Sequence, residues 1–215
     1  MKKIYSWAVV IVLLSLCIVA CRDGYEKGKT KPYHVPYAID RYHIPTKCTI
    51  ESLEIKEETT QLLWLLKFGN EGGSESYISA VKNKEFFTKI ALEHGEDGSG
   101  FMTSMPIPLP HLLYGLESLQ AIGIKGEEEV NISQIVQIRY NSSEDFIRSG
   151  YKHISEVRLK EVQKSLATLT PNDYLWIPEE SFLLSNRSEV EGKFDRIELR
   201  VVLKDGKTLR ANMPM

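Results

Sequence analysis

The clearest constraint on the fold is a strictly alternating segment near the end of the chain. Apolar residues occupy every second position between residues 196 and 204, at Ile197, Leu199, Val201 and Leu203. This period is typical of a strand with one buried face. Asp205 and Gly206 follow, and an Asp-Gly pair between two alternating segments is a strong hairpin signal. We therefore predict a hairpin whose second strand covers residues 208–213.

Shorter signals of the same kind recur along the chain. Strands are predicted over residues 49–56, 62–68, 116–124, 130–140 and 174–178. A short helix is predicted over Ser143–Gly150, because Ser143 can cap its start and glycine ends it. Residues 77–92 and 151–170 fit either a helix or a strand. Short strands at this spacing predict a mainly β protein, an antiparallel β-sandwich (Ig-like or related) with one or two short peripheral helices.

The first residues have the features of an export signal. Lys2 and Lys3 precede an apolar segment that continues to Ala20. A basic start, a short apolar core and a small residue at the cleavage site mark a secretory signal peptide. The alternative is a membrane-spanning helix, but residues 4–20 lie at the lower limit of the length that crosses about 30 Å of hydrocarbon.

Residues 18–21, Ile-Val-Ala-Cys, resemble the lipobox of bacterial lipoproteins. This resemblance implies cleavage before Cys21 and attachment of lipid to its sulfur and its new amino group. Several acyl chains anchor a protein stably, whereas one chain binds a membrane only marginally. Arg22 follows the cysteine, in place of the aspartate associated with inner-membrane retention in enteric bacteria, and this favours the outer membrane.

The export signal divides the chain into three predicted parts. Residues 1–20 are a signal peptide, residues 21–47 are the lipidated cysteine and a tether, and residues 48–215 are a single β-sandwich domain. Loss of residues 1–20 leaves 25 of the 27 basic residues against all 29 acidic ones, a formal charge of −4. Nucleic acid is therefore not an expected partner, because binding to phosphates needs a basic excess. The expected partners are the membrane, through the lipid anchor, and a glycan or envelope protein.

Cys48 is the one cysteine left after Cys17 and Cys21 are assigned to the signal and the anchor. An odd cysteine in an exported protein can be a reactive thiol. Free cysteine is also among the most often buried residue types. Because Cys48 opens an apolar segment, we expect it to be buried.

The sequence contains no recognisable catalytic motif. It has no G-x-S-x-G, no Walker A sequence and no dinucleotide fingerprint. Glu179 and Glu180 form a carboxylate pair, which we interpret as part of an exposed turn. We therefore expect a protein without enzymatic activity.

One acidic, glycine-rich segment is a candidate for a metal site. Glu93, Glu96 and Asp97 could supply oxygen ligands to calcium, but the segment lacks the alternating acids and the closing glutamate of an EF-hand. The alternative is a solvated acidic turn. We expect no cofactor, with calcium as the candidate ion.

Aromatic residues are the best candidates for ligand contact. Trp176 and Tyr174 lie beside Pro178 and two acidic residues in an irregular segment, with Phe182 nearby. Exposed aromatic side chains mark recognition sites. Trp64 alternates with leucines, so we expect it in the core.

The order of several short motifs resembles a family of Bacteroidetes lipoproteins gathered under a domain of unknown function, DUF5034. The motifs are the lipobox, Glu51–Leu53, Ser142–Phe146, Asn172–Trp176 and the terminal hairpin. The resemblance implies an envelope setting and supplies no active site.

These observations lead to three functional hypotheses. The first is an envelope-anchored lipoprotein that acts as a non-catalytic binding or adhesion-type module for a glycan or a protein. The second is a structural or assembly role, in which the edge of the terminal hairpin pairs with an envelope partner by β-augmentation. The third is an enzyme that acts on polysaccharide.

Overall fold

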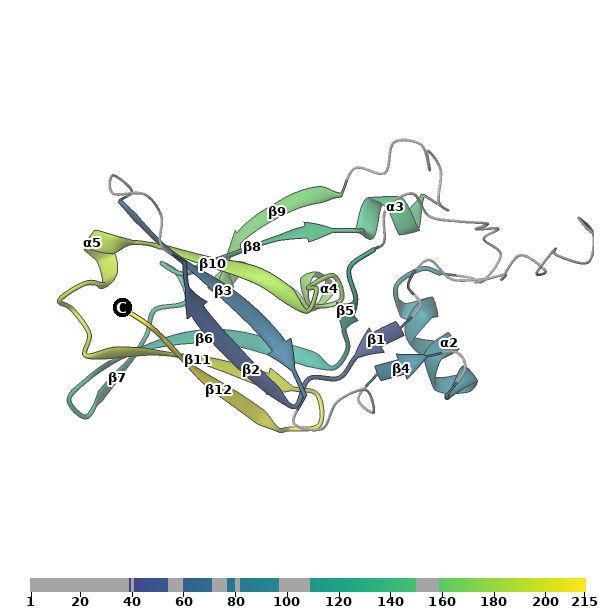
Figure 1. The fold of residues 1–215 in the computed structure, drawn as a ribbon, viewed down its shortest axis with the longest axis horizontal. Coiled ribbons are helices and arrows are strands. Elements are labelled where there is room, and N and C mark those ends of the chain that lie inside the picture. Colours follow the sequence, from purple (N-terminus) through teal and green to yellow (C-terminus); the bar gives the residue numbers. More distant parts are fainter. Residues whose placement is uncertain are drawn as a thin grey trace, which may run out of the picture.

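The computed structural model describes residues 39, 41–53, 60–70, 77–79, 82–96, 109–149 and 159–215. Their fold is mainly β, with three sheets in which all pairings but one are antiparallel (Figure 1). Cys21, Asp97, residues 151–158 and all of residues 1–38 lie outside the described residues.

The four-stranded sheet has the order β12-β11-β6-β7. Its strands are β6 (Leu116–Lys125), β7 (Glu128–Asn131), β11 (Arg196–Leu203) and β12 (Thr208–Met213). The predicted terminal hairpin is confirmed. Gly206 has a φ of +86° in its turn, a conformation that glycine adopts without steric cost.

The five-stranded sheet has the order β2-β3-β10-β8-β9. Its strands are β2 (Lys47–Ser52), β3 (Gln61–Gly69), β10 (Glu180–Asn186), β8 (Gln137–Ser142) and β9 (Lys160–Ser165). The sequence reading missed the central strand, β10. It also predicted one strand over residues 130–140, where the chain forms β7 and β8 with a turn between them.

The third sheet is small and consists of β4 (Tyr77–Ser79), β1 (Arg41–His43) and β5 (Leu112–Leu113). Strand β1 pairs antiparallel with β4 and parallel with β5. It lies in the segment that we assigned to the tether, but Tyr42 is fully buried. The folded part of the chain therefore begins before residue 48.

The described residues contain four α-helices, more than the one or two predicted. These are α2 (Lys84–Glu93), α3 (Glu144–Arg148), α4 (Pro171–Tyr174) and α5 (Arg187–Val190), with a 3-10 turn, η3, at Leu166–Thr168. Residues 77–92 thus form a strand and then a helix, which begins where the Asn83 side chain accepts a hydrogen bond from the Phe86 N–H. Residues 159–170 contain β9 and η3.

Two local predictions were wrong for identifiable reasons. Ser143 stands at the start of α3 but makes no capping hydrogen bond; the Ser142 hydroxyl accepts the Glu144 N–H instead. Residues 174–178 do not form a strand. Thr170 and Asp173 form a capping box that starts α4 in this region.

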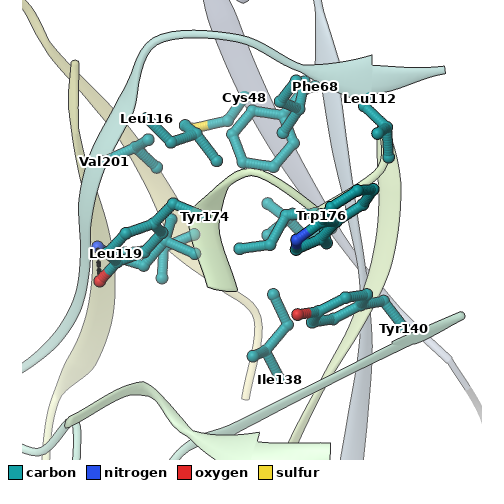
Figure 2. Packing of buried hydrophobic residues seen from close by; sticks show 14 of the residues in the cluster. Cys48, Phe68, Leu112, Leu116, Leu119, Ile138, Tyr140, Tyr174, Trp176 and Val201 are labelled. Carbon is teal, nitrogen blue, oxygen red and sulfur yellow. Dashed lines mark hydrogen bonds between the residues drawn. The ribbon is translucent and has the colours of Figure 1, made fainter. Parts of the chain in front are cut away.

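Buried side chains from both larger sheets belong to one hydrophobic cluster (Figure 2). Cys48 lies within it, as expected, and burial raises the pKa of its thiol to about 11. Trp64 is also buried, and its indole N–H donates to the Pro214 carbonyl at 2.6 Å. Strand β12 is an edge strand of its sheet and lies close to β2, the edge strand of the five-stranded sheet (Figure 1).

Candidate functional site

A pocket lies where β8 and β10 separate. These strands pair at only three positions, from Leu184 opposite Gln137 to Phe182 opposite Arg139. Beyond Arg139, β8 continues with β9, whereas β10 remains with β3. A pocket of about 570 Å³ is lined by both strands past this point, and we call it the β8/β10 pocket.

The lining of this pocket is polar and carries both signs of charge. Its lining includes the polar residues His111, Arg139, Asn141, Glu161, Glu179 and Glu180, together with the aromatic residues Tyr140 and Phe182. A lining of this kind can orient a ligand, because the orientation of a bound ligand depends on a few well-placed polar groups.

Glu179 is a carboxylate of this pocket that lies close to two histidines. Its Oε1 lies 3.1 Å from His43 Nδ1 and 3.5 Å from His111 Nδ1. Burial alone would raise the pKa of Glu179, but the nearby His43, Tyr77 and His111 side chains hold it below its usual range. The group is therefore an anion at neutral pH.

Backbone pairing brings His111 and Glu179 together. Leu112 forms a bridge with Pro178, and the Glu179 N–H donates to the His111 carbonyl at 3.1 Å. The Glu179 carbonyl in turn accepts the Phe68 N–H at 2.9 Å, which ties it to β3. The side chains of His111 and Glu179 therefore come from segments that are held in place by backbone hydrogen bonds to neighbouring segments.

The small third sheet holds the rings behind Glu179. His43 in β1 is paired with Tyr77 in β4, and their rings stack with centroids 4.9 Å apart. The Tyr77 and His111 rings meet edge-on with centroids 5.6 Å apart. The Arg41 guanidinium lies 5.4 Å from the centre of the Tyr77 ring. Since His43 is buried, this layer supports the pocket from behind.

The opposite wall combines a cation and an aromatic ring. Arg139 and Phe182 face each other across β8 and β10, and the guanidinium lies 5.4 Å from the ring centre. Such stacking holds a flexible arginine in place. Glu161 on β9 and Glu180 on β10 are exposed on either side.

The aromatic residues that we predicted as ligand contacts are buried. Trp176 is 1% exposed and Tyr174 is 8% exposed. Both rings lie among other buried hydrophobic side chains (Figure 2). The cause is α4, which turns the chain inward and packs Trp176 edge-on against His94 at 5.2 Å. Phe182 is the aromatic residue of that region which reaches the pocket.

The predicted calcium ligands do not gather in the described residues. Glu93 ends α2 and is exposed, whereas Glu96 is buried and accepts a hydrogen bond from the Tyr42 hydroxyl at 3.0 Å. Asp97 lies outside the described residues. Within the ranges that the structure describes, no group of three or more His, Cys, Asp or Glu side chains could hold a metal ion.

Sequence reasoning missed His43, Tyr77, His111 and Arg139, and it took Glu179 for an exposed turn residue. These side chains come from distant segments with no spacing in common, so no linear motif marks them. One usable signal was the short apolar segment Phe182-Leu183-Leu184 soon after Pro178, which fits a buried strand. A strand there would have placed Glu179 beside its start.

In the described part of the chain, no helix has both the length and the apolar character needed to cross a bilayer. Comparison of the chain with protein-family models, with curated proteins and with solved structures gives no match.

Proposed function

We propose that the chain is a lipid-anchored lipoprotein of the bacterial cell envelope, attached to the outer membrane through Cys21. Its β domain is a non-catalytic module that binds a glycan in the β8/β10 pocket. The basic and apolar start of the chain and the Ile-Val-Ala-Cys sequence support the anchor.

The observation that carries the binding proposal is the lining of the β8/β10 pocket. Carboxylates, an amide and a guanidinium can exchange several hydrogen bonds with sugar hydroxyls, and Phe182 offers apolar contact beside them. The balance of Glu161, Glu179 and Glu180 against Arg139 disfavours phosphorylated or acidic ligands. A neutral glycan is the class that this lining fits best.

The domain is proposed to be a β-sandwich. In support, both larger sheets contribute to one hydrophobic cluster: Trp64, Leu66 and Leu183 come from one sheet, and Leu119, Leu199 and Val201 come from the other.

The test is binding of neutral oligosaccharides to the full chain in detergent, measured by calorimetry and by thermal unfolding. A ligand at about 100 times its dissociation constant should add about 2.7 kcal/mol of stability. Phe182→Ala should abolish this gain. The matched control is Leu65→Ala, because Leu65 is the cross-strand neighbour of Phe182 and does not line the pocket.

Two results would contradict the proposal. If Phe182→Ala and Leu65→Ala bind equally well, the ligand does not occupy this pocket. If the oligosaccharides are cleaved, and Glu161→Gln or Glu180→Gln prevents the cleavage, the pocket belongs to an enzyme.

A further inference from the structure

A second pocket lies further along β10, on the same face of the five-stranded sheet as the β8/β10 pocket. Successive side chains of a strand point to opposite faces, so Glu180, Phe182, Leu184 and Asn186 share one face of β10. Glu180 and Phe182 line the β8/β10 pocket, whereas Leu184 and Asn186 line the second one. From Phe182 to Asn186 the strand extends by roughly 13 Å. The two pockets therefore follow each other along one strand.

The face that carries both pockets is turned away from the hydrophobic cluster. Leu183, on the opposite face of β10, is fully buried and belongs to that cluster. Phe182 is half-buried and Leu184 is buried, and neither belongs to it. On β8, Arg139 lies opposite Phe182 and Gln137 lies opposite Leu184. The surface between the two pockets is therefore made by two successive residue pairs of the same ladder.

The second pocket has a volume of about 180 Å³ and a polar lining. Four of the eight described residues that line it carry side-chain amides, and we call it the amide pocket. Among its described lining residues, Glu189 alone is charged. The amides are those of Gln61, Gln134, Gln137 and Asn186.

Two of these amides are held by hydrogen bonds that leave one end of each group for a ligand. The Gln137 Oε1 accepts a hydrogen bond from the Gln163 side chain at 2.6 Å, so its Nε2 is left as a donor. The Asn186 Nδ2 donates to the Glu189 carboxylate at 3.1 Å, so its Oδ1 is left as an acceptor. The pocket therefore offers both a donor and an acceptor in fixed positions.

We propose, building on the glycan-binding role proposed for the β8/β10 pocket, that one extended neutral glycan of several sugar residues occupies both pockets. One part of the glycan lies in the β8/β10 pocket. The chain then follows β10 past Phe182 and Leu184, and its other part binds the side chains of the amide pocket.

The chemistry of the amide pocket suits sugar hydroxyls. An amide and a hydroxyl each donate and accept hydrogen bonds, so they can pair in either direction. In the described part of the chain, the side-chain amides of Gln61 and Gln134 are exposed and bond to no other residue. They can therefore turn toward a ligand without loss of a bond within the protein. The charge of Glu189 disfavours acidic sugars, as does the excess of carboxylates in the β8/β10 pocket.

The test measures how affinity depends on the length of the glycan. Cello-, malto-, manno- and xylo-oligosaccharides, each from monosaccharide to hexasaccharide, are titrated into the full chain in detergent and followed by calorimetry. In a series that binds, we expect the affinity to rise about tenfold once the glycan reaches the amide pocket, the effect of one or two added hydrogen bonds.

Variants of the amide pocket separate its contribution from that of the β8/β10 pocket. Gln61→Ala combined with Gln134→Ala should lower the affinity for the longest glycan about tenfold and leave the affinity for short ones unchanged. The matched control is Gln120→Ala, because Gln120 is also an exposed glutamine but lies in the other large sheet and lines neither pocket. Phe182→Ala should abolish binding at every length. Thermal unfolding shows that each variant is folded.

Failure of the second contact differs from failure of glycan binding itself. If short and long glycans bind equally well, the extension to the amide pocket is overturned, while glycan binding in the β8/β10 pocket stands. The same holds if the folded double variant binds the longest glycan as tightly as the unmodified chain. If no oligosaccharide of any length binds, both proposals are overturned.

Discussion

At the scale of single residues, His94 is a buried titratable group outside the β8/β10 pocket. It is fully buried at the end of α2, and both ring nitrogens lie close to carbonyl oxygens, Nδ1 at 2.7 Å from Ile90 and Nε2 at 2.8 Å from Leu175. A neutral imidazole can donate to one of these carbonyls only. Burial lowers the pKa of His94, although the two carbonyls and Glu93 oppose this effect and Lys204 reinforces it.

This lowered pKa predicts an acid-sensitive fold. The unfolded chain takes up a proton on His94 near its ordinary pKa of about 6.5, whereas the folded chain resists protonation until the pH is lower. The stability that neutral His94 contributes is therefore complete above about pH 6.5 and is lost as the pH falls below it.

His94→Gln should reduce the difference in free energy of unfolding between about pH 7.5 and about pH 5.5. Denaturant unfolding at both pH values measures it. The variant should also be less stable at the higher pH by roughly 1–3 kcal/mol, because buried hydrogen bonds are lost. An equal pH dependence in the variant and the unmodified chain would show that His94 is not the group responsible.

At the scale of elements, the close packing of β6 depends on Gly123. A Cβ built on Gly123 would lie 2.5 Å from two carbons of the Phe194 ring, closer than carbon atoms can approach. Phe194 is half-buried and lies two residues before β11, so its ring covers the end of the sheet where β6 and β11 pair. The glycine is needed for this approach and not for a special backbone angle.

Gly123→Ala should therefore lower the free energy of unfolding by about 1–3 kcal/mol, the usual cost of overpacking. The same substitution in a Phe194→Ala background should be neutral or stabilising, because alanine is favoured over glycine in a strand once the ring is removed. A thermal or denaturant double-mutant cycle measures the coupling. Equal losses in both backgrounds would mean that the Phe194 ring is not the cause.

The sequence predicted elements well where one residue pattern dominated. The alternation in β11 and β3 and the Asp-Gly turn are local signals, so those strands were found. The α2 segment was ambiguous because Phe86, Thr88, Ile90 and Leu92 alternate while the same stretch also fits a helix. The capping bond of Asn83 decides for the helix.

The candidate sites were far less predictable. His111 and Glu179 meet only because residues 111–113 and 177–179 pair in the fold. Burial of Cys48 and Trp64 was predictable, since each lies in an apolar alternating segment.

At the scale of the whole molecule, the proposed attachment through Cys21 can be separated from folding. Cys21→Ala should prevent lipidation, so that most of the protein is recovered in the soluble fraction with unchanged thermal stability. The control is Cys48→Ala, which alters a buried thiol of the domain and should leave membrane attachment intact. Fractionation of cells followed by immunodetection measures both, and retention of Cys21→Ala in the membrane would contradict the anchor.

The short third sheet has a mechanical consequence. In the described fold the chain enters the domain at Ile39 and β1, which is held by three residue pairs to β4 and two to β5. If the anchor is pulled against a bound glycan, the load reaches β1 before any longer strand. Strand β1 carries His43, which contacts Glu179 in the β8/β10 pocket. Separation of β1 under force would therefore remove this contact and lower the affinity of the pocket for the glycan. Binding of the glycan in the β8/β10 pocket would then weaken while both larger sheets remain folded.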